Sequence, residues 1–266
     1  MAVAVRIIPA PFDGLAFPTN YKYFRQVNYV NFSMIRSDIC PLVSCLCVTH
    51  HQPDMLQRAI KCFANQTYSN CQMVVIYEEI NHSTVEFIEN TSLDCRFKLV
   101  KVSQSQSKLS LGELRNLSVK HADGEYVCQW DDDDWYDPER LSVQMEALLA
   151  SRKPACVLSR WIILDKHRHT AYLSNRRLWE GSIMCRRDLM EQNPYAALSK
   201  GEDTDIIHNL YRQGQLAIIE DSPEIYVYVY HGSNTWETEH FTEIFNRSTK
   251  LSQESCKQIL ETVRNY

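Results

Sequence analysis

Residues 126–135 read Tyr-Val-Cys-Gln-Trp-Asp-Asp-Asp-Asp-Trp, an apolar run that ends in four consecutive aspartates, Asp131–Asp134, and a second tryptophan. Clustered carboxylates repel one another and resist desolvation, so proteins normally separate them or leave them in open water. If the strand continued through the aspartates, Asp131 and Asp133 would project from the same face, roughly 6.5 Å apart. Two carboxylates on one face suit Mg²⁺ or Mn²⁺. The alternative interpretation is a solvated acidic turn that follows a strand.

The sequence around this stretch alternates between predicted strands and helices. Short continuous apolar runs predict strands that are buried on both faces; they are Leu42–Val48, Met73–Tyr77, Phe97–Val102 and Tyr126–Trp130. Helical spacing and start signals predict helices after Pro53, over Leu111–Leu117 and after Asp137-Pro138. This alternation predicts an α/β fold whose central sheet is mostly parallel and carries helices on both faces. The second half predicts strands at Ala155–Leu164, Leu216–Glu220 and Ile225–Tyr230 and a helix at Asp203–Gln213.

The composition of the chain argues against a nucleic-acid-binding protein and against a membrane-spanning one. The chain has 266 residues, a formal charge of −5 and 44% hydrophobic residues, which suffices for one large domain or two small ones. Because no block of Lys and Arg supplies phosphate contacts, we expect no nucleic-acid partner. No apolar run is long enough to predict a transmembrane segment. The ten cysteines fall largely in apolar runs without paired zinc-ligand spacing, which predicts reduced thiols and a cytoplasmic protein.

Polar side chains follow three of the predicted strands. Thr49 follows the first strand, Glu78-Glu79 follows the second, and the aspartates follow the strand from Tyr126. In open parallel sheets, ligands bind in the crevice at the carboxyl ends of the strands. Helix caps also attract Thr, Glu and Asp, but three clusters at one predicted edge favour a binding site.

The order of short motifs across Pro41–Tyr230 resembles the family 2 glycosyltransferases, which have the GT-A fold. Each motif is weak alone, and the order and spacing make the resemblance specific. The motifs are Gln66-Thr67-Tyr68, Gly112-x-x-Arg115-Asn116, Gly124-Glu125-Tyr126, Asp131–Asp134, Gly181-Ser182, Arg186-Arg187-Asp188 and Gly201-Glu202-Asp203. Two strand ends depart from the family pattern: Glu78-Glu79 replace the usual aspartates, and Thr49-His50-His51 replace an aromatic-Asn ending.

Residues 1–40 lack clear periodicity and are interpreted as an N-terminal extension. The resemblance implies a GT-A domain with a smaller acceptor-side subregion at 41–235, which leaves a C-terminal helical segment at 236–266. It further implies a metal-dependent inverting transferase, loaded with Mn²⁺ or Mg²⁺, that moves a sugar from a nucleotide-sugar, in particular a UDP-sugar, to a glycan or other hydroxyl acceptor.

The resemblance also assigns roles to residues. Asp131, Asp133 and His231 are the expected metal ligands. Asp203 is the expected catalytic base, Glu202 the second choice, and a plain helix cap is the structural alternative for Asp203. The expected nucleotide contacts are Thr49, Glu78, Arg115 and Asp132. The indole of Trp179 is a further candidate for stacking on a sugar, against the alternative of an ordinary core residue.

Three other functions compete with this interpretation. A nucleotidyltransferase would carry a Gly- and Lys-rich phosphate loop near the first strand, and no glycine lies between Pro41 and Leu111. A non-catalytic binding protein on the same scaffold would be expected to lack the aspartate run or the Glu202-Asp203 pair. A glycoside hydrolase needs two carboxylates that flank the scissile bond from separate elements, about 5 to 10 Å apart.

Overall fold

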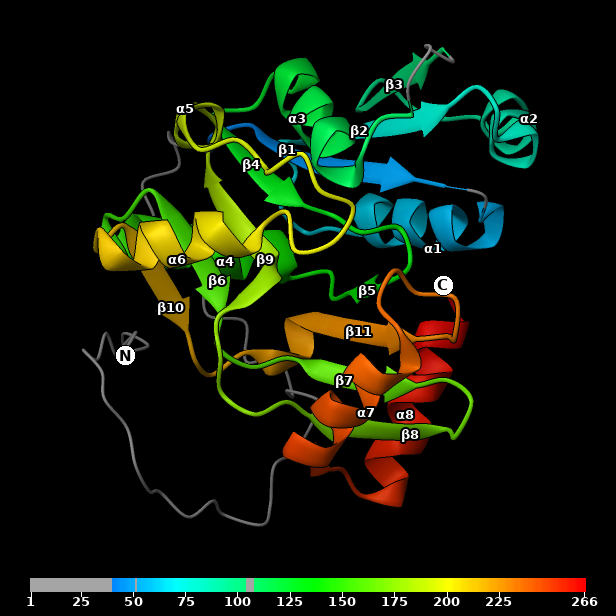
Figure 1. Ribbon diagram of the computed structural model, residues 1–266, viewed down its shortest axis with the longest axis vertical. Helices are drawn as coiled ribbons and strands as arrows, with labels where there is room; N and C mark the ends of the chain where they lie inside the picture. The colour runs from blue at the N-terminus through cyan, green and yellow to red at the C-terminus, as the bar shows by residue number, and fades with distance from the viewer. Residues whose placement is uncertain (1–39, 51, 104–107) are drawn as a thin grey trace.

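The computed structural model describes residues 40–50, 52–103 and 108–266. A seven-stranded sheet occupies one half of the molecule and a five-stranded sheet the other (Figure 1). The elements of the first half of the chain are β1 Val43–Thr49, α1 Pro53–Ala64, β2 Cys71–Glu78, α2 His82–Asn90, β3 Phe97–Val102, α3 Leu111–His121, β4 Tyr126–Gln129, β5 Trp135–Tyr136 and α4 Arg140–Ser151. They are followed by β6 Ala155–Leu158, β7 Ile162–Asp165, β8 Thr170–Leu173, β9 Trp179–Arg186, α5 Arg187–Gln192, α6 Thr204–Arg212, β10 Leu216–Ile219, the 3₁₀ turn Pro223–Ile225, β11 Tyr226–Tyr230, α7 Thr238–Arg247, β12 Thr249–Lys250 and α8 Gln253–Arg264.

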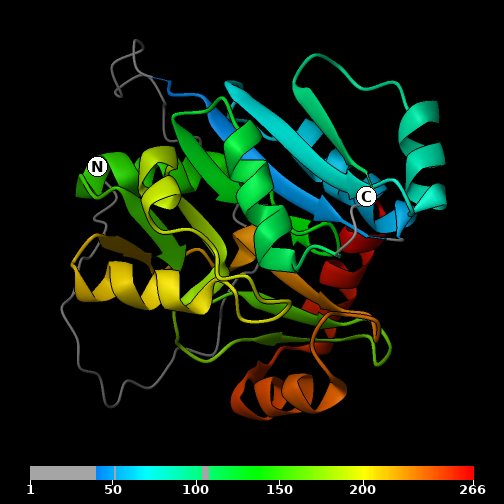
Figure 2. The same ribbon diagram turned by 45° about the horizontal axis from the view of Figure 1, so that its top comes forward.

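The first sheet has the strand order β10-β6-β9-β4-β1-β2-β3. Every neighbouring pair is parallel except those of β9, which runs antiparallel to both β4 and β6. Apolar side chains of α1 and α4 pack in one cluster and those of α3, α5 and α6 in another, so helices cover both faces of the sheet (Figure 2). The predicted α/β fold with a mostly parallel, two-sided sheet is confirmed.

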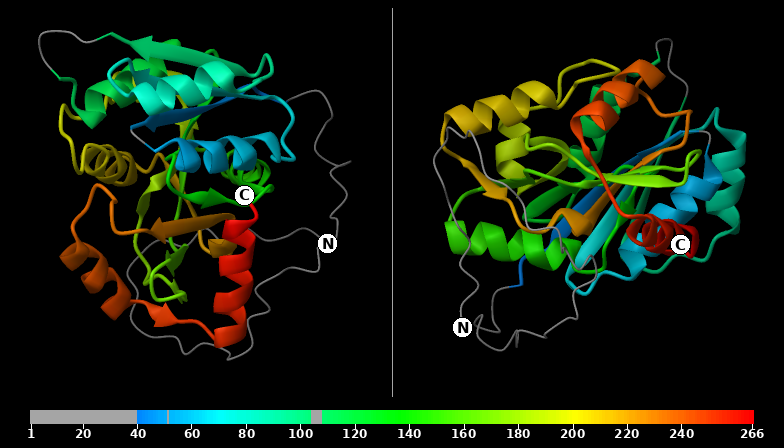
Figure 3. Two further views of the ribbon diagram at one scale, coloured as in Figure 1. Left: turned by 90° about the vertical axis from the view of Figure 1, so that its right-hand side faces the viewer. Right: turned by 90° about the horizontal axis from the view of Figure 1, so that it is seen from below.

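The second sheet, with the order β12-β8-β7-β11-β5, was not predicted. Its helices α7 and α8 lie on opposite faces (Figure 3). Neighbouring residues of β8 contact the two helices. Tyr172 stacks on Phe245 of α7, and the backbone N–H of Ala171 donates a hydrogen bond to the thiol of Cys256 in α8.

The predicted strand Ala155–Leu164 is wrong in one respect, because the structure divides it between the two sheets. β6 pairs with β9 and β10 in the first sheet, and β7 pairs with β8 and β11 in the second. The chain crosses between them at residues 159–161, where Trp161 stacks on Trp179 with ring centroids 4.3 Å apart. Trp179 is 9% exposed. It is therefore a core residue, and its expected stacking on a sugar is not supported.

All ten cysteines are free thiols, and eight of them are buried. Burial raises the pKa of several of these thiols, among them Cys47, Cys62 and Cys156, which makes them slow to react because the thiolate is the nucleophile. Within the described residues, no helix is both long enough and apolar enough to cross a membrane.

A thiol titration tests this arrangement. We expect a thiol reagent to modify about two cysteines quickly in the native protein, the exposed Cys40 and Cys95, and ten after denaturation, since reagents reach buried thiols only when the chain opens. Substitution of Cys95 by Ser should remove one fast thiol, whereas substitution of the buried Cys185 should leave the fast count unchanged. Mass shifts that reveal disulfides in freshly purified protein would contradict the reduced state.

Candidate active site

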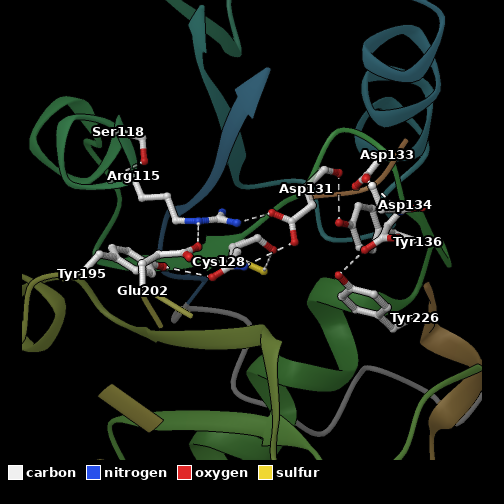
Figure 4. Close-up of polar contacts among 12 residues, drawn as sticks. Arg115, Ser118, Cys128, Asp131, Asp133, Asp134, Tyr136, Tyr195, Glu202 and Tyr226 are labelled. Carbon is white, nitrogen blue, oxygen red and sulfur yellow. Dashed lines mark hydrogen bonds and ion pairs between the residues drawn. The ribbon is translucent and has the colours of Figure 1, made fainter. Parts of the chain in front are cut away.

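The aspartate run forms a turn between the two sheets. β4 ends at Gln129 and β5 begins at Trp135, so Asp131–Asp134 lie outside both strands. The four carboxylates consequently do not follow the alternation of a strand. Asp131 points toward Arg115, whereas Asp134 points toward Tyr226 (Figure 4). The expectation that Asp131 and Asp133 share one strand face is therefore wrong. The backbone of the four aspartates forms a turn, as the alternative interpretation predicted, although Asp134 is buried and not solvated.

Arg115 of α3 joins two of the predicted site residues. Its Nε donates to Glu202 Oε1 at 2.7 Å, and its Nη2 donates to Asp131 Oδ1 at 2.7 Å. The side chains of Arg115 and Glu202 are only 8% and 4% exposed. Burial lowers the pKa of Arg115, but Asp131 and Glu202 outweigh burial and raise it well above its ordinary value. Arg115 is thus a fixed positive charge that holds two carboxylates, which are 71 residues apart in the sequence, in one network.

The other residues of the Gly112-x-x-Arg115-Asn116 motif fix this helix to the loop before α6. The Asn116 amide forms two hydrogen bonds with the backbone of Tyr195, each 2.9 Å long. A Cβ on Gly112 would lie 1.8 Å from the carbonyl oxygen of Ala196 and 3.2 Å from the Cβ of Glu202. Glycine is therefore needed where α3 meets the loop. Sequence reasoning recognised the motif but missed this positioning role.

Asp203 stands at the N-cap position of α6, yet its side chain makes no capping hydrogen bond. Because the carboxylate does not cap the helix, the structure gives no support for the alternative that Asp203 is only a helix cap. Burial, followed by the adjacent Glu202, raises the pKa of Asp203 to about 7, while Arg115 acts in the opposite direction. Its neighbour Glu202 is instead bound to Arg115. The two carboxylates therefore differ in environment. Glu202 is paired with the buried Arg115, whereas the Asp203 carboxylate makes no hydrogen bond to the helix that it begins.

Asp133 meets the residues that follow β11. His231 Nε2 lies 3.1 Å from Asp133 Oδ2, and Asn234 Nδ2 donates to the same oxygen at 3.3 Å. Asp133 and His231 thus lie together, as the family resemblance implied, but Asp131 is turned away to Arg115. Among the described residues, no group of three or more His, Cys, Asp or Glu side chains is placed to hold a metal ion. Asp133 and His231 alone would supply one oxygen and one nitrogen ligand. That pair fits a Mg²⁺- or Mn²⁺-type ion whose remaining ligands come from phosphates and water.

Asp134 is structural. It is 1% exposed, its Oδ2 accepts a hydrogen bond from the Tyr226 hydroxyl at 2.5 Å, and its Oδ1 accepts one from the Val229 backbone at 2.9 Å. Burial and the neighbouring Asp133 raise its pKa well above the ordinary value. This contact attaches the turn to β11 of the second sheet.

Three of the four residues expected to bind the nucleotide lie at one edge of the first sheet, whereas the fourth, Arg115, lies in α3 and is bound to Glu202 and Asp131. Because β1 pairs in parallel with both β2 and β4, the last residues of β1 and β2, Thr49 and Glu78, lie beside the aspartate turn that follows β4. Glu78 Oε2 lies 3.1 Å from His50 Nδ1. Burial and the charge of Asp133 raise the pKa of Asp132 to about 7.

One exposed aromatic residue near this site was missed. Trp236 is 38% exposed, and its ring stacks on His240 with centroids 4.5 Å apart. Lys200, three residues before Asp203, lies over the same ring and forms an ion pair with Glu237. No periodic signal marks an isolated tryptophan in a loop, so the sequence did not predict it.

The chain is similar in sequence to known glycosyltransferases. The family model "Glycosyl transferase family 2" matches residues 44–209. Bacillus subtilis EpsH is 26% identical over 100 residues, which cover 37% of this chain and 28% of EpsH. An uncharacterized glycosyltransferase of Methanocaldococcus jannaschii is 28% identical over 130 residues, which cover 48% of this chain and 44% of the relative. Each match spans less than half of the relative's own length.

Solved structures show the same fold. Residues 1–349 of S. aureus TarS in complex with UDP-GlcNAc give a TM-score of 0.54 at 17% identity, covering 84% of this chain and 71% of that one. A mannosyltransferase from Pyrobaculum calidifontis in complex with GDP-Man and Mn²⁺ gives 0.53 at 15% identity, covering 73% and 57%. The architecture is therefore the GT-A fold, and because the family model covers more than half of its residues, the chain belongs to glycosyl transferase family 2.

Proposed function

We propose that this protein transfers a sugar from a nucleotide-sugar, in particular a UDP-sugar, to a hydroxyl of a glycan or similar acceptor, with inversion and with a divalent cation. The observation that carries the proposal is the Asp203 carboxylate, which has a raised pKa and makes no capping hydrogen bond. It lies beside a buried Arg115 network that reaches the aspartate turn. A base near neutrality next to a potential phosphate site is what such a transfer requires.

On the donor side, different residues are proposed to bind the nucleotide and the metal ion. Thr49, Glu78 and Asp132, at the strand ends, are proposed to contact the nucleotide. Asp133 and His231 are proposed to hold Mn²⁺ or Mg²⁺, which when bound neutralises the charge that develops on the departing diphosphate. The complexes of TarS with UDP-GlcNAc and of the mannosyltransferase with GDP-Man and Mn²⁺ support a nucleotide-sugar donor and a divalent cation as the ligands.

On the acceptor side, Asp203 is proposed to accept the proton of the attacking hydroxyl. Arg115 positions the neighbouring Glu202 and Asp131 and does not transfer a proton. Trp236, which is 38% exposed, is proposed to contact the acceptor sugar, since Lys200 connects it to the loop that carries Asp203. The reduced cysteines support our proposal of a cytoplasmic location.

Metal dependence is tested by thermal unfolding in the presence of UDP. We expect UDP to raise the melting temperature clearly with Mn²⁺ or Mg²⁺ and little with EDTA, because a ligand that binds the folded state stabilises it by mass action. Asp133→Asn should abolish most of the metal-dependent shift. Asp123→Asn, which changes an exposed carboxylate paired with Lys98, is the matched control. Equal shifts with metal and with EDTA would refute the metal site.

The pKa of Asp203 predicts a pH dependence. A base acts only when it is deprotonated, so kcat should rise through pH 7 and reach a plateau about one to two units above it. Because the pKa of Asp132 is also raised to about 7, the profile should be measured at saturating donor, where nucleotide binding no longer limits the rate. A kcat that stays constant between pH 6 and pH 8 would argue against Asp203 as the base.

A further inference from the structure

A cavity of about 310 Å³ lies between α1 and α8 beside the end of β7. Four cationic side chains line it, Arg58, Lys61, Lys166 and Arg264, against a single carboxylate, Asp54. The protein as a whole carries a formal charge of −5, so the positive charge around this cavity is opposite in sign to the net charge of the protein. A cleft lined by charges of one sign raises the local concentration of counter-ions.

In the part of the chain that the structure describes, none of the four cations forms an ion pair with an Asp or Glu side chain. Arg58, which is 7% exposed, donates to the backbone oxygens of Asp133 and Asp134, and Arg264 lies 3.4 Å from a His169 nitrogen. Four like charges around one cavity repel one another, and an anion in the cavity would relieve that repulsion.

The rest of the lining is mainly apolar. It consists of Leu164, Leu260, Val263 and Tyr266, together with the amide side chain of Gln57. The volume falls in the usual range of small-molecule sites, which combine an apolar wall with a few polar groups. Guanidinium and ammonium groups together suit phosphate, because Arg offers two parallel donors and Lys a compact charge.

The walls of the cavity belong to the segments that carry Asp133 and His231. Arg58 holds the backbone of the aspartate turn. The backbone N–H of Lys166 donates to the carbonyl of Tyr230, the residue before His231, at 3.0 Å. An anion in the cavity would therefore contact the residues that support this pair, so its binding can influence the active site without contact with the donor.

We propose that this cavity binds a phosphate group, either as free phosphate or as part of a phosphorylated small molecule, at a site separate from that of the nucleotide. The proposal rests on the cavity and its charges and does not depend on the glycosyltransferase activity. Its residues Lys61 and Lys166 are not part of the proposed transfer machinery.

Binding should be measured by calorimetry with potassium phosphate, with potassium chloride at equal ionic strength as the reference and glucose 6-phosphate as the phosphorylated probe. We expect phosphate binding that chloride does not reproduce. Lys61→Gln and Lys166→Gln should each weaken it roughly tenfold, the scale of one charge-assisted hydrogen bond. Lys257→Gln on α8, whose side chain pairs with Glu261 outside the cavity, should leave the affinity unchanged.

Tighter binding of glucose 6-phosphate than of free phosphate would identify a phosphorylated metabolite as the class of ligand, and the reverse order would identify free phosphate. Saturation with UDP and Mg²⁺ should not displace the anion. The proposal is overturned if phosphate gives no signal beyond chloride, if the control variant loses as much affinity as the cavity variants, or if UDP competes with phosphate. Melting temperatures without ligand verify that each variant is folded.

Discussion

Replacement of Asp203 by Asn should lower the turnover of sugar transfer by roughly a hundredfold or more, the scale of losing a general base. The affinity for the metal–nucleotide complex should stay near that of the wild type, because Asp203 is proposed to act on the acceptor after the donor has bound. The substitution is nearly isosteric, and the native carboxylate makes no capping hydrogen bond that the amide could lose. The folded structure should therefore tolerate it, and single-turnover assays with saturating donor measure the effect.

Two comparisons make this result specific. Asp205→Asn changes an exposed carboxylate in the first turn of the same helix, and we expect it to leave turnover within about twofold, as surface substitutions usually do. Glu202→Gln should act mainly through stability, since Glu202 is bound to Arg115. Near-normal turnover in Asp203→Asn, or an equal loss of donor affinity and turnover, would remove Asp203 from the role of base.

Replacement of Arg115 by Met should lower the free energy of unfolding by about 3 to 5 kcal/mol, because it leaves buried carboxylates without their cation. Glu202 is 4% exposed and Asp131 23% exposed, so water can compensate Asp131 but hardly Glu202. Urea denaturation followed by circular dichroism measures the change. Arg115→Lys should recover part of the loss, since one ammonium cannot reproduce both guanidinium contacts.

The matched control is Arg176→Met, which removes an exposed ion pair with Glu220; exposed pairs contribute about 0 to 1 kcal/mol. The double substitution Arg115→Met with Glu202→Gln should be less destabilised than Arg115→Met alone, because a neutral amide costs less to bury than a carboxylate. A loss in Arg115→Met no greater than that of the control would show that the network contributes little to stability.

The parallel strands β1 to β4 of the first sheet were predictable because their apolar runs are continuous and are separated by helices with clear start signals. The run Ala155–Leu164 was predicted as a single strand because it is apolar on both sides of Arg160, and no periodicity marks the point where a chain passes from one sheet to another. β9 was missed because Trp179–Arg186 includes a glycine, two charged residues and a serine, which dilute the strand pattern. β5 has two residues, too few for any pattern.

The sequence predicted which residues belong to the candidate site, but not which of their side chains contact each other. The resemblance to family 2 glycosyltransferases grouped Asp133 with His231, and the structure puts them 3.1 Å apart. It also grouped Asp131 with them, whereas Asp131 pairs with Arg115. That pairing depends on how α3 packs on the loop beyond Tyr195, a contact between distant parts of the chain that spacing cannot reveal.

The passage of residues 155–165 from the first sheet to the second has a consequence for folding. Because one continuous segment supplies a strand to each sheet, and because Asp134 is hydrogen-bonded to β11, neither sheet can be completed independently of the other. The two halves should consequently unfold in one cooperative transition. The aspartate turn lies between them, so a fragment that contained only the first sheet would retain all four aspartates but could not assemble Asp133 with His231. Assembly of that pair and completion of the fold are thus a single event.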